Sequence, residues 1–190
     1  MYISPPEIAL RRLTRVNELL LETVAGMYDE QASKWVCPTA PSAKWHLWHM
    51  ARWSDLVQSM LVPVTSGESD LSDHGDQAWH ALAIGDEWGF EDANPGKWGA
   101  GVGLDDNEAA RLPLPETAKV VGYARSAFEL AERRFAEVDD GMFDMVFWDW
   151  HDRETTVGDG LFSHIAHANR HLGMIEALRG VIGMRGTATE

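Results

Sequence analysis

The segment GLFSHIAHANRHLGMIEALRG, residues 160–180, decides the fold of this protein. Apolar side chains recur in it at spacings of four, three, four and three residues: Leu161, Ile165, Ala168, Leu172 and Ile175. That period is typical of an amphipathic α-helix with one buried face. His164, His167 and His171 lie within about 60° of one another on the flank of this face, at ~100° per residue. We therefore expect three imidazoles to point inward or sideways and not into solvent.

A second segment, SAKWHLWHMARWSDLVQSML at residues 42–61, has the same character. One arc of its helix carries Trp45, His49, Trp53, Leu56, Val57 and Met60. The polar residues Lys44, Arg52, Asp55, Gln58 and Ser59 share the other arc. His46 also belongs to the inward arc, roughly 60° from His49. Two helices are therefore predicted to send imidazoles toward the interior.

Helical periodicity recurs in two more segments, whereas strand signals are scarce. The predicted helices run from Pro5 to about Glu30, from Ser42 to about Val62, from Pro115 to near Asp139, and from Thr156 to Gly180 or Gly183. Ser42 and Thr156 are suitable N-caps, and Pro63 is expected to stop the second helix. Residues 64–112 are rich in glycine and tryptophan, which predicts a long excursion with a short helix around 76–88. The sequence thus predicts an all-α, antiparallel four-helix bundle forming a single domain over residues 1–190.

Composition excludes several classes of protein. Lysine and arginine number 16 against 30 aspartates and glutamates, a formal net charge of -14, so nucleic acid and anionic membrane surfaces are not expected partners. Cys37 is the single cysteine, which excludes an internal disulfide and favours a reducing compartment. No apolar run approaches the ~20 residues that span a bilayer, and the N-terminus lacks an apolar signal core. We therefore expect a cytoplasmic protein.

The clustered histidines predict a metal centre. Burying several imidazoles costs free energy unless their nitrogens find partners, and a divalent ion satisfies neutral imidazole nitrogens together. His167 and His171 have the i, i+4 spacing that lets two rings reach one ion, and His49 is the best-placed third donor on a facing helix. Three protein ligands with an open position are typical of catalytic metal sites. We therefore predict one mononuclear site at these three residues.

Other interpretations of the same residues remain open. One buried histidine is more often a hydrogen-bonded core residue than a ligand, so His46 and His164 are assigned to packing or to support of the ligands. Trp45 and Trp53 are most simply core anchors beside the site. The sequence contains no HExxH motif and no Glu-x-x-His pair, which excludes a zincin-type site and a di-iron carboxylate bundle.

Two stretches carry a resemblance to a known family. Ser42–His49 resembles the S-x-x-W-x-L-x-H signature, and His164–Gly173 the H-x-x-H-x-x-x-H-x-G signature, of the DinB/YfiT-like superfamily of metal-binding four-helix bundles. The segment Asp86–Gly99 resembles that family's loop more weakly. The resemblance implies that His49, His167 and His171 are the metal ligands, and that His46 and His164 are not.

The resemblance also implies a range of activities. Similar domains are metal-dependent hydrolases, S-transferases or isomerases that use low-molecular-weight thiols such as bacillithiol and mycothiol, or iron-binding halves of sulfoxide synthases. We expect a divalent ion, zinc or nickel with iron as a third option, that activates a water molecule or a thiol for reaction with a small-molecule substrate. A non-catalytic metal-binding or stress-associated bundle is the alternative, and a homodimer is a further expectation.

The residues around the predicted ion receive roles with less support. Residues 64–112 and the aromatic bridge Trp148–Trp150 are expected to wall the cavity, and Arg52 or Arg170 to contact an anion. Asp149, Asp152 and Glu154 are candidates for a general base only by their closeness in sequence. Transfer from a thiol needs no such base once the thiolate exists, which favours transferase chemistry over hydrolysis.

Overall fold

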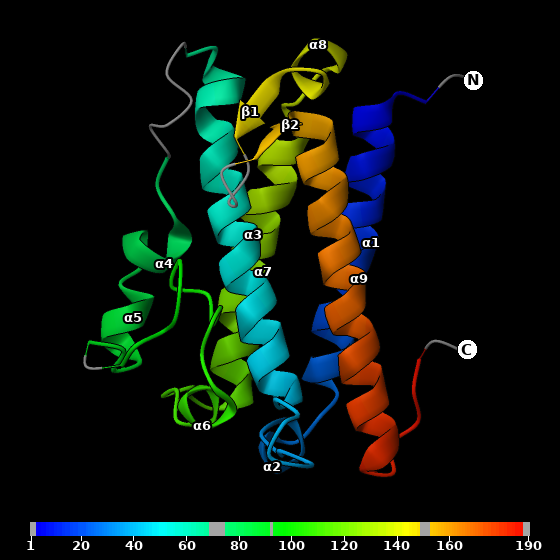
Figure 1. Ribbon diagram of the computed structural model, residues 1–190. Helices are drawn as coiled ribbons and strands as arrows, with labels where there is room; N and C mark the ends of the chain where they lie inside the picture. The colour runs from blue at the N-terminus through cyan, green and yellow to red at the C-terminus, as the bar shows by residue number, and fades with distance from the viewer. Residues whose placement is uncertain (1–2, 69–74, 92, 149–152, 188–190) are drawn as a thin grey trace.

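The computed structural model describes residues 3–68, 75–91, 93–148 and 153–187. Four long helices lie side by side: α1 (Pro5–Ala25), α3 (Ala43–Ser66), α7 (Thr117–Ala136) and α9 (Val157–Val181) (Figure 1). Five short helices occupy the connections: α2 (Asp29–Ala32), α4 (Ala78–Ala81), α5 (Ile84–Glu87), α6 (Asp106–Ala110) and α8 (Asp140–Phe143). Strand β1 (Val146–Trp148) pairs antiparallel with β2 (Glu154–Thr156). The predicted all-α bundle is confirmed.

The helix directions do not alternate as a simple antiparallel bundle would. Between α3 and α9 the order of contacts is reversed, because His46 meets His171 and Ser54 meets His164, so these helices run in opposite directions. Between α3 and α7 the order is the same in both helices, because Asp55 meets Tyr123 and Thr65 meets Arg134. Helices α3 and α7 are therefore parallel neighbours. The long excursion explains this, since it carries the chain back to the end where α3 begins (Figure 1).

Helix caps confirm two of the predicted boundaries and correct a third. The Ser42 hydroxyl accepts from the Trp45 backbone N–H at 3.1 Å, and the Thr156 hydroxyl from that of Asp159 at 3.1 Å. Helix α1, however, ends at Ala25 and not near Glu30. The chain leaves the helix at Gly26, and α2 is a separate turn beyond it.

Pro63 lies inside α3 and does not end it as predicted. A proline removes the hydrogen bond to the carbonyl four residues earlier, here that of Ser59. In the structure the Gly75 backbone N–H donates to this carbonyl at 2.9 Å, so the excursion satisfies it. The helix continues to Ser66 and is capped by Gly67, which adopts a left-handed conformation with φ of 71°.

Helix α3 is buried on every side, which the sequence pattern did not predict. Its supposed outer arc is buried together with its apolar arc: Lys44, Arg52, Asp55, Gln58 and Ser59. The excursion and α7 cover this polar side (Figure 1). Polar side chains tolerate such burial when they find hydrogen-bond partners. Arg52 donates to Tyr123 of α7, and Gln58 donates to the Asp76 carbonyl of the excursion.

Local structure within the connections differs from the prediction in two places. The single short helix expected around 76–88 is two helices, α4 and α5, separated at Ala83, which has a positive φ of 49°. The aromatic bridge contains β1, because its backbone pairs with the residues just before α9. His74, His151, Trp150 and the predicted general-base candidates Asp149 and Asp152 lie outside the described residues.

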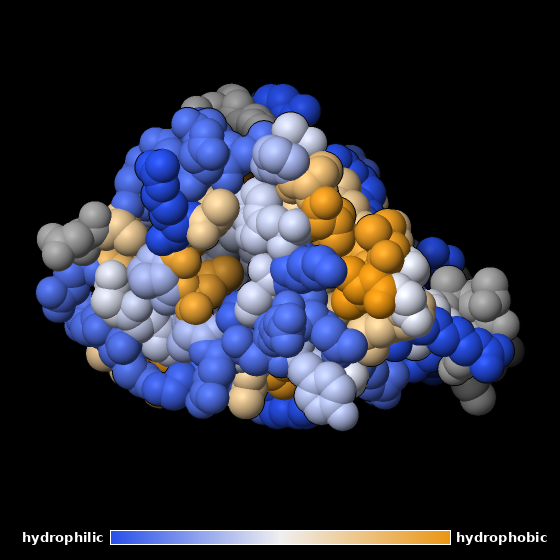
Figure 2. All heavy atoms as spheres, turned by 90° about the horizontal axis from the view of Figure 1, so that it is seen from below, coloured by the Kyte–Doolittle hydropathy of each residue, from blue (hydrophilic) through white to orange (hydrophobic). Residues whose placement is uncertain are grey.

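The described chain exposes few large hydrophobic side chains. None of its helices combines the length and apolar character that a membrane crossing requires. Seen from below, hydrophobic residues gather at one side of the molecule, where the last turns of α9 lie (Figure 2). Val181 in that helix is 69 % exposed. The predicted homodimer and the cytoplasmic location stay predictions.

Candidate metal centre

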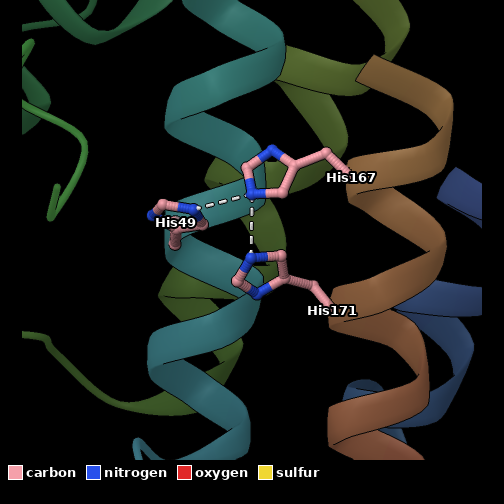
Figure 3. Close-up of side chains that lie close together, drawn as sticks. All are labelled: His49, His167 and His171. Atoms are coloured by element: carbon pink, nitrogen blue, oxygen red, sulfur yellow. Dashed lines mark hydrogen bonds between the residues drawn. The ribbon is translucent and has the colours of Figure 1, made fainter. Parts of the chain in front are cut away.

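Three imidazoles from two helices meet inside the bundle. His49 projects from α3, and His167 and His171 project from α9 toward it (Figure 3). The Nε2 atom of His167 lies 3.4 Å from that of His49 and 2.9 Å from that of His171. Each ring offers one nitrogen to a group whose members all lie within 4.8 Å of one another, as a shared metal ion requires. The three predicted ligands are therefore brought together.

A backbone carbonyl fixes the orientation of His49. Its Nδ1 atom lies 2.5 Å from the carbonyl oxygen of Ala100, in the excursion. A carbonyl oxygen only accepts hydrogen bonds, so Nδ1 carries the proton and Nε2 presents its lone pair. Metal-binding histidines are typically held in this way by a carbonyl or carboxylate. The Trp45 indole stacks on the His49 ring with centroids 4.9 Å apart.

The loop that delivers this carbonyl depends on glycine. Gly99 and Gly101 flank Ala100 and have positive φ values of 66° and 83°. A Cβ atom at Gly101 would lie 2.8 Å from the Trp45 ring and 3.0 Å from the Trp48 ring. Only a residue without a side chain lets the backbone pass this close to the histidines. Ala100 could not be identified by its side chain, and the surrounding glycines were the one available signal.

His46 and His164 lie next to the site but outside the group of three. The Nδ1 atom of His46 lies 2.9 Å from Nδ1 of His171, on the opposite edge of that ring from its Nε2. His164 is one turn of α9 earlier than His167, and its Nε2 lies 3.1 Å from the Ser54 hydroxyl. The Nδ1 atom of His164 is buried without a hydrogen-bond partner. Neither ring offers a nitrogen to the three-histidine group, in agreement with their assignment to support or packing.

Burial keeps these imidazoles neutral. It lowers the pKa of His46 to about 4, and burial with the nearby Arg170 lowers that of His167 to about 4. Burial, and next the proximity of His167, lowers the pKa of His49 to about 3. The pKa of His171 falls far below its ordinary value because of burial and then of His49 and His167. At neutral pH all four rings therefore present lone pairs rather than positive charge.

A divalent cation satisfies the three neutral imidazoles better than hydrogen bonds among them can. With His49 protonated on Nδ1, its Nε2 is a lone pair, and a single N–H among the three converging nitrogens satisfies only one contact. In the other Nε2–Nε2 contact two like groups then face each other without a hydrogen bond, and unsatisfied polar atoms in the interior are costly. A divalent ion accepts lone pairs from all three nitrogens, and imidazole is a preferred ligand of zinc, nickel and iron. The donor set is therefore compatible with metal binding.

Aromatic rings form the walls around the three histidines. Trp53 on α3 contacts His167 at a centroid distance of 5.6 Å, and Trp98 of the excursion contacts Trp53 at 5.6 Å. His49 and His171 are only 5 % and 8 % exposed, whereas His167 is half-buried. The site therefore opens to solvent on the side of His167.

The two arginines predicted to contact an anion have different surroundings. Arg52 is 2 % exposed and donates to the carbonyl of Gly99 at 2.9 Å, to Tyr123 and to Gln77. These contacts commit its guanidinium to protein partners, so its geometry indicates a structural role and not the expected anion contact. Arg170 is exposed on α9, and its charge acts on His167 and His171. It remains a predicted anion contact.

A buried carboxylate, missed by the sequence analysis, holds the excursion against the bundle. Asp55 has no exposed surface and accepts from the backbone N–H groups of Ala78 and Trp79, each at 2.8 Å. It also accepts from the Tyr123 hydroxyl at 3.0 Å and pairs with Arg52 at 3.4 Å. Burial raises the pKa of Tyr123, so the hydroxyl stays a donor. This network positions the segment that carries Ala100.

Comparison with known proteins identifies the family and agrees with the fold. The family model of the DinB superfamily matches residues 12–175 of the chain. A solved structure, the crystal structure of a conserved protein from Enterococcus faecalis, has a TM-score of 0.75 and 22% sequence identity. The match covers 96% of this chain and 99% of that one, and at this identity it shows the shared fold alone. A search among curated proteins found no match.

Proposed function

The chain belongs to the DinB superfamily, and we propose that it is an enzyme that depends on one divalent metal ion held by His49, His167 and His171. The observation that carries this proposal is the convergence of three Nε2 atoms from α3 and α9 within bonding reach of a shared ion. We propose zinc or nickel as the ion, with iron as a third option, because neutral imidazole suits all three.

The proposed reaction is transfer of a low-molecular-weight thiol to a small electrophilic substrate. A divalent ion on three imidazoles supplies Lewis acidity, which lowers the pKa of a thiol or a water molecule toward neutrality. The sulfur then forms a bond to the electrophilic carbon, the leaving group departs with its electron pair, and the thiol proton passes to solvent. This chemistry needs no carboxylate, and in the described part of the chain the group of potential ligands contains imidazoles only.

The residues around the histidines support a small, partly apolar substrate. Trp53 lies beside His167, on the side open to solvent, and Trp98 lies against Trp53. Arg170 places a positive charge near His167 in a chain whose net charge is -14. We propose that this charge attracts a thiolate or the carboxylate of a thiol cofactor.

Hydrolysis and non-catalytic metal binding are the two alternatives to this function. Hydrolysis would use the same ion to activate water, but of the predicted base candidates only Glu154 is described, and it lies exposed in β2. A non-catalytic bundle in which metal holds the helices together is favoured by the low exposure of His49 and His171. A binding-only protein would hold metal without turnover.

Metal analysis and a paired variant test the proposal. We expect protein purified without chelators to hold about one divalent ion per chain, and His167→Ala to lose it while keeping its helical circular dichroism. The matched control is His80→Ala, because His80 is an exposed histidine on α4. Wild type without bound metal in both elemental analysis and titration would refute the proposal.

Turnover distinguishes the proposed activities. The loaded protein is assayed with a panel of low-molecular-weight thiols and monochlorobimane as electrophile, and separately with a nitrophenyl ester. Thiol-dependent product that His167→Ala abolishes supports the transferase, and ester cleavage without a thiol supports the hydrolase. Stoichiometric metal with neither activity over the whole panel favours the binding-only bundle.

A further inference from the structure

His46 carries a contact that the proposed metal site leaves unexplained. It lies on α3 and is 5 % exposed, and its Nδ1 atom lies 2.9 Å from Nδ1 of His171. Two ring nitrogens at this distance share one proton, because two lone pairs or two N–H groups would repel. One of the two rings must therefore donate and the other accept.

Which of the two rings donates decides which nitrogen of His171 carries its proton. If His171 donates from Nδ1, its Nε2 is a lone pair directed at the three-histidine group. If His46 donates, the neutral His171 carries its proton on Nε2, 2.9 Å from Nε2 of His167. That proton would occupy the position where a metal ion must bind. The tautomer of His171 thus depends on its partner at Nδ1.

We propose that His46 is a positioning residue that accepts the Nδ1 proton of His171 and so keeps the Nε2 atom of His171 free to bind metal. Its role matches that of the Ala100 carbonyl, which accepts from Nδ1 of His49 at 2.5 Å. Two of the three ligands are then held by acceptors on their far edges, one from the backbone and one from a side chain. The consequence for metal affinity rests on the proposed function, whereas the tautomer itself does not.

The geometry separates this role from that of a fourth ligand. Any nitrogen that joins the site must lie with the three Nε2 atoms, and in the described residues the group contains only His49, His167 and His171. His46 faces the opposite edge of the His171 ring. Its ring also packs against Trp45 at a centroid distance of 5.4 Å, so a purely structural role is the alternative that the test must exclude.

The first test uses the metal-free, full-length protein and needs no variant. Long-range proton–nitrogen correlation spectra at neutral pH distinguish the two neutral tautomers of each histidine. We expect His171 to be protonated on Nδ1 and His46 on Nε2. A His171 ring protonated on Nε2 would overturn the proposal. This measurement remains decisive even if the protein binds no metal, so failure of the proposed function is distinguishable from failure of the inference.

The second test compares two variants that separate hydrogen bonding from packing. His46→Phe keeps an aromatic ring and removes the acceptor, whereas His46→Asn loses the ring and keeps an acceptor near the position of Nδ1. We expect His46→Phe to bind Co²⁺ about 10–100-fold more weakly than wild type, as is typical when the partner of a metal-binding histidine is lost. His46→Asn should recover most of this loss and keep the Nδ1-protonated tautomer of His171.

Two outcomes of the variant experiment would refute the role. Tighter binding by His46→Phe than by His46→Asn would assign His46 to packing alone. A change in the intensity of the visible Co²⁺ bands at saturation in both variants would make His46 a ligand. Thermal melting of each metal-free variant checks that affinity is compared between folded proteins.

Discussion

The Nδ1 atom of His49 lies 2.5 Å from the carbonyl oxygen of Ala100, and this contact joins the buried histidines to the glycine-rich excursion. The two residues are 51 positions apart in the chain. Arg52, one turn after His49 on α3, donates to the neighbouring carbonyl of Gly99 at 2.9 Å. The excursion therefore takes part in the site, because it sets the tautomer of His49.

Enlarging Gly101 should disturb this contact. The Cβ atom of Gly101→Ala would meet the rings of Trp45 and Trp48, and φ at this position is 83°. Gly103→Ala is the matched control, because φ is 78° there but nothing lies within 4 Å of the added Cβ. Both variants place alanine in a left-handed conformation, which is unfavourable in each. The difference between their stabilities therefore measures the clash of the Gly101→Ala side chain with Trp45 and Trp48.

We expect Gly101→Ala to lower the free energy of unfolding by about 1–3 kcal/mol more than Gly103→Ala, as overpacking does. It should also weaken metal binding, because the Ala100 carbonyl moves away from His49. Urea denaturation and Co²⁺ titration of both variants measure these effects. Equal losses in the two variants would show that the close approach at Gly101 is unimportant.

Acid should destabilise the metal-free protein at unusually high pH. Burial lowers the pKa of His46, His49 and His167 from 6.5 to between about 3 and about 4 in the folded chain. The unfolded chain therefore binds more protons than the folded chain below about pH 6.5, and stability falls as the pH decreases toward these folded values. Each pKa difference of one unit corresponds to about 1.4 kcal/mol.

The measurement is the free energy of unfolding by urea between pH 7.5 and pH 5, with a chelator present. This window excludes Asp29, whose pKa is lowered from 3.8 to about 2 chiefly by its hydrogen bond from Thr117, because its stabilisation is lost only at lower pH. Constant stability across the window would contradict the buried, neutral state of the imidazoles.

Replacing Asp55 should release the excursion from the bundle. The side chain of Asp55→Asn keeps the size of the carboxylate but brings an NH₂ group toward backbone donors at Ala78 and Trp79, and it leaves the buried Arg52 without its charge partner. Removing one member of a buried ion pair typically costs about 3–5 kcal/mol. Asp86→Asn makes the same chemical change at an exposed position of α5 and should alter stability by less than about 0.5 kcal/mol.

Hydrogen exchange gives the second readout for Asp55→Asn. Backbone amides of residues 96–103 should exchange faster in this variant than in wild type, while those in the middle of α1 keep their protection. Unchanged exchange in residues 96–103 would mean that the buried network does not hold this loop.

Removing the charge of Arg170 should affect metal and substrate in opposite directions. The arginine lowers the pKa of His167 and His171 by repelling their protonated forms, and the same repulsion opposes a bound cation. Arg170→Gln should therefore tighten Co²⁺ binding slightly, by about two- to fivefold, if the repulsion is worth about 0.5–1 kcal/mol. The KM for an anionic thiol should rise, because the attraction is lost. Arg12→Gln, at an exposed position of α1, is the control, and a lower KM in Arg170→Gln would contradict the assignment.

Helical periodicity was sufficient to predict the bundle and the group of three histidines. Apolar residues at helical spacing identified the four long helices, since each must bury one face. The i, i+4 pair of His167 and His171 and the inward arc containing His49 identified the group of three, because both follow from the pitch of a single helix. Capping by Ser42 and Thr156 was equally local and was predicted correctly.

How the excursion completes the site follows from contacts between residues that are distant in the chain. Pro63 stays within α3 because Gly75 supplies a distant donor, and the polar side of α3 is buried because the excursion covers it. The acceptor for His49 is a backbone carbonyl, which every residue possesses, so no side chain could reveal it. Helical periodicity reports which side of a helix is apolar, whereas the partner of a buried polar atom depends on where the rest of the chain passes.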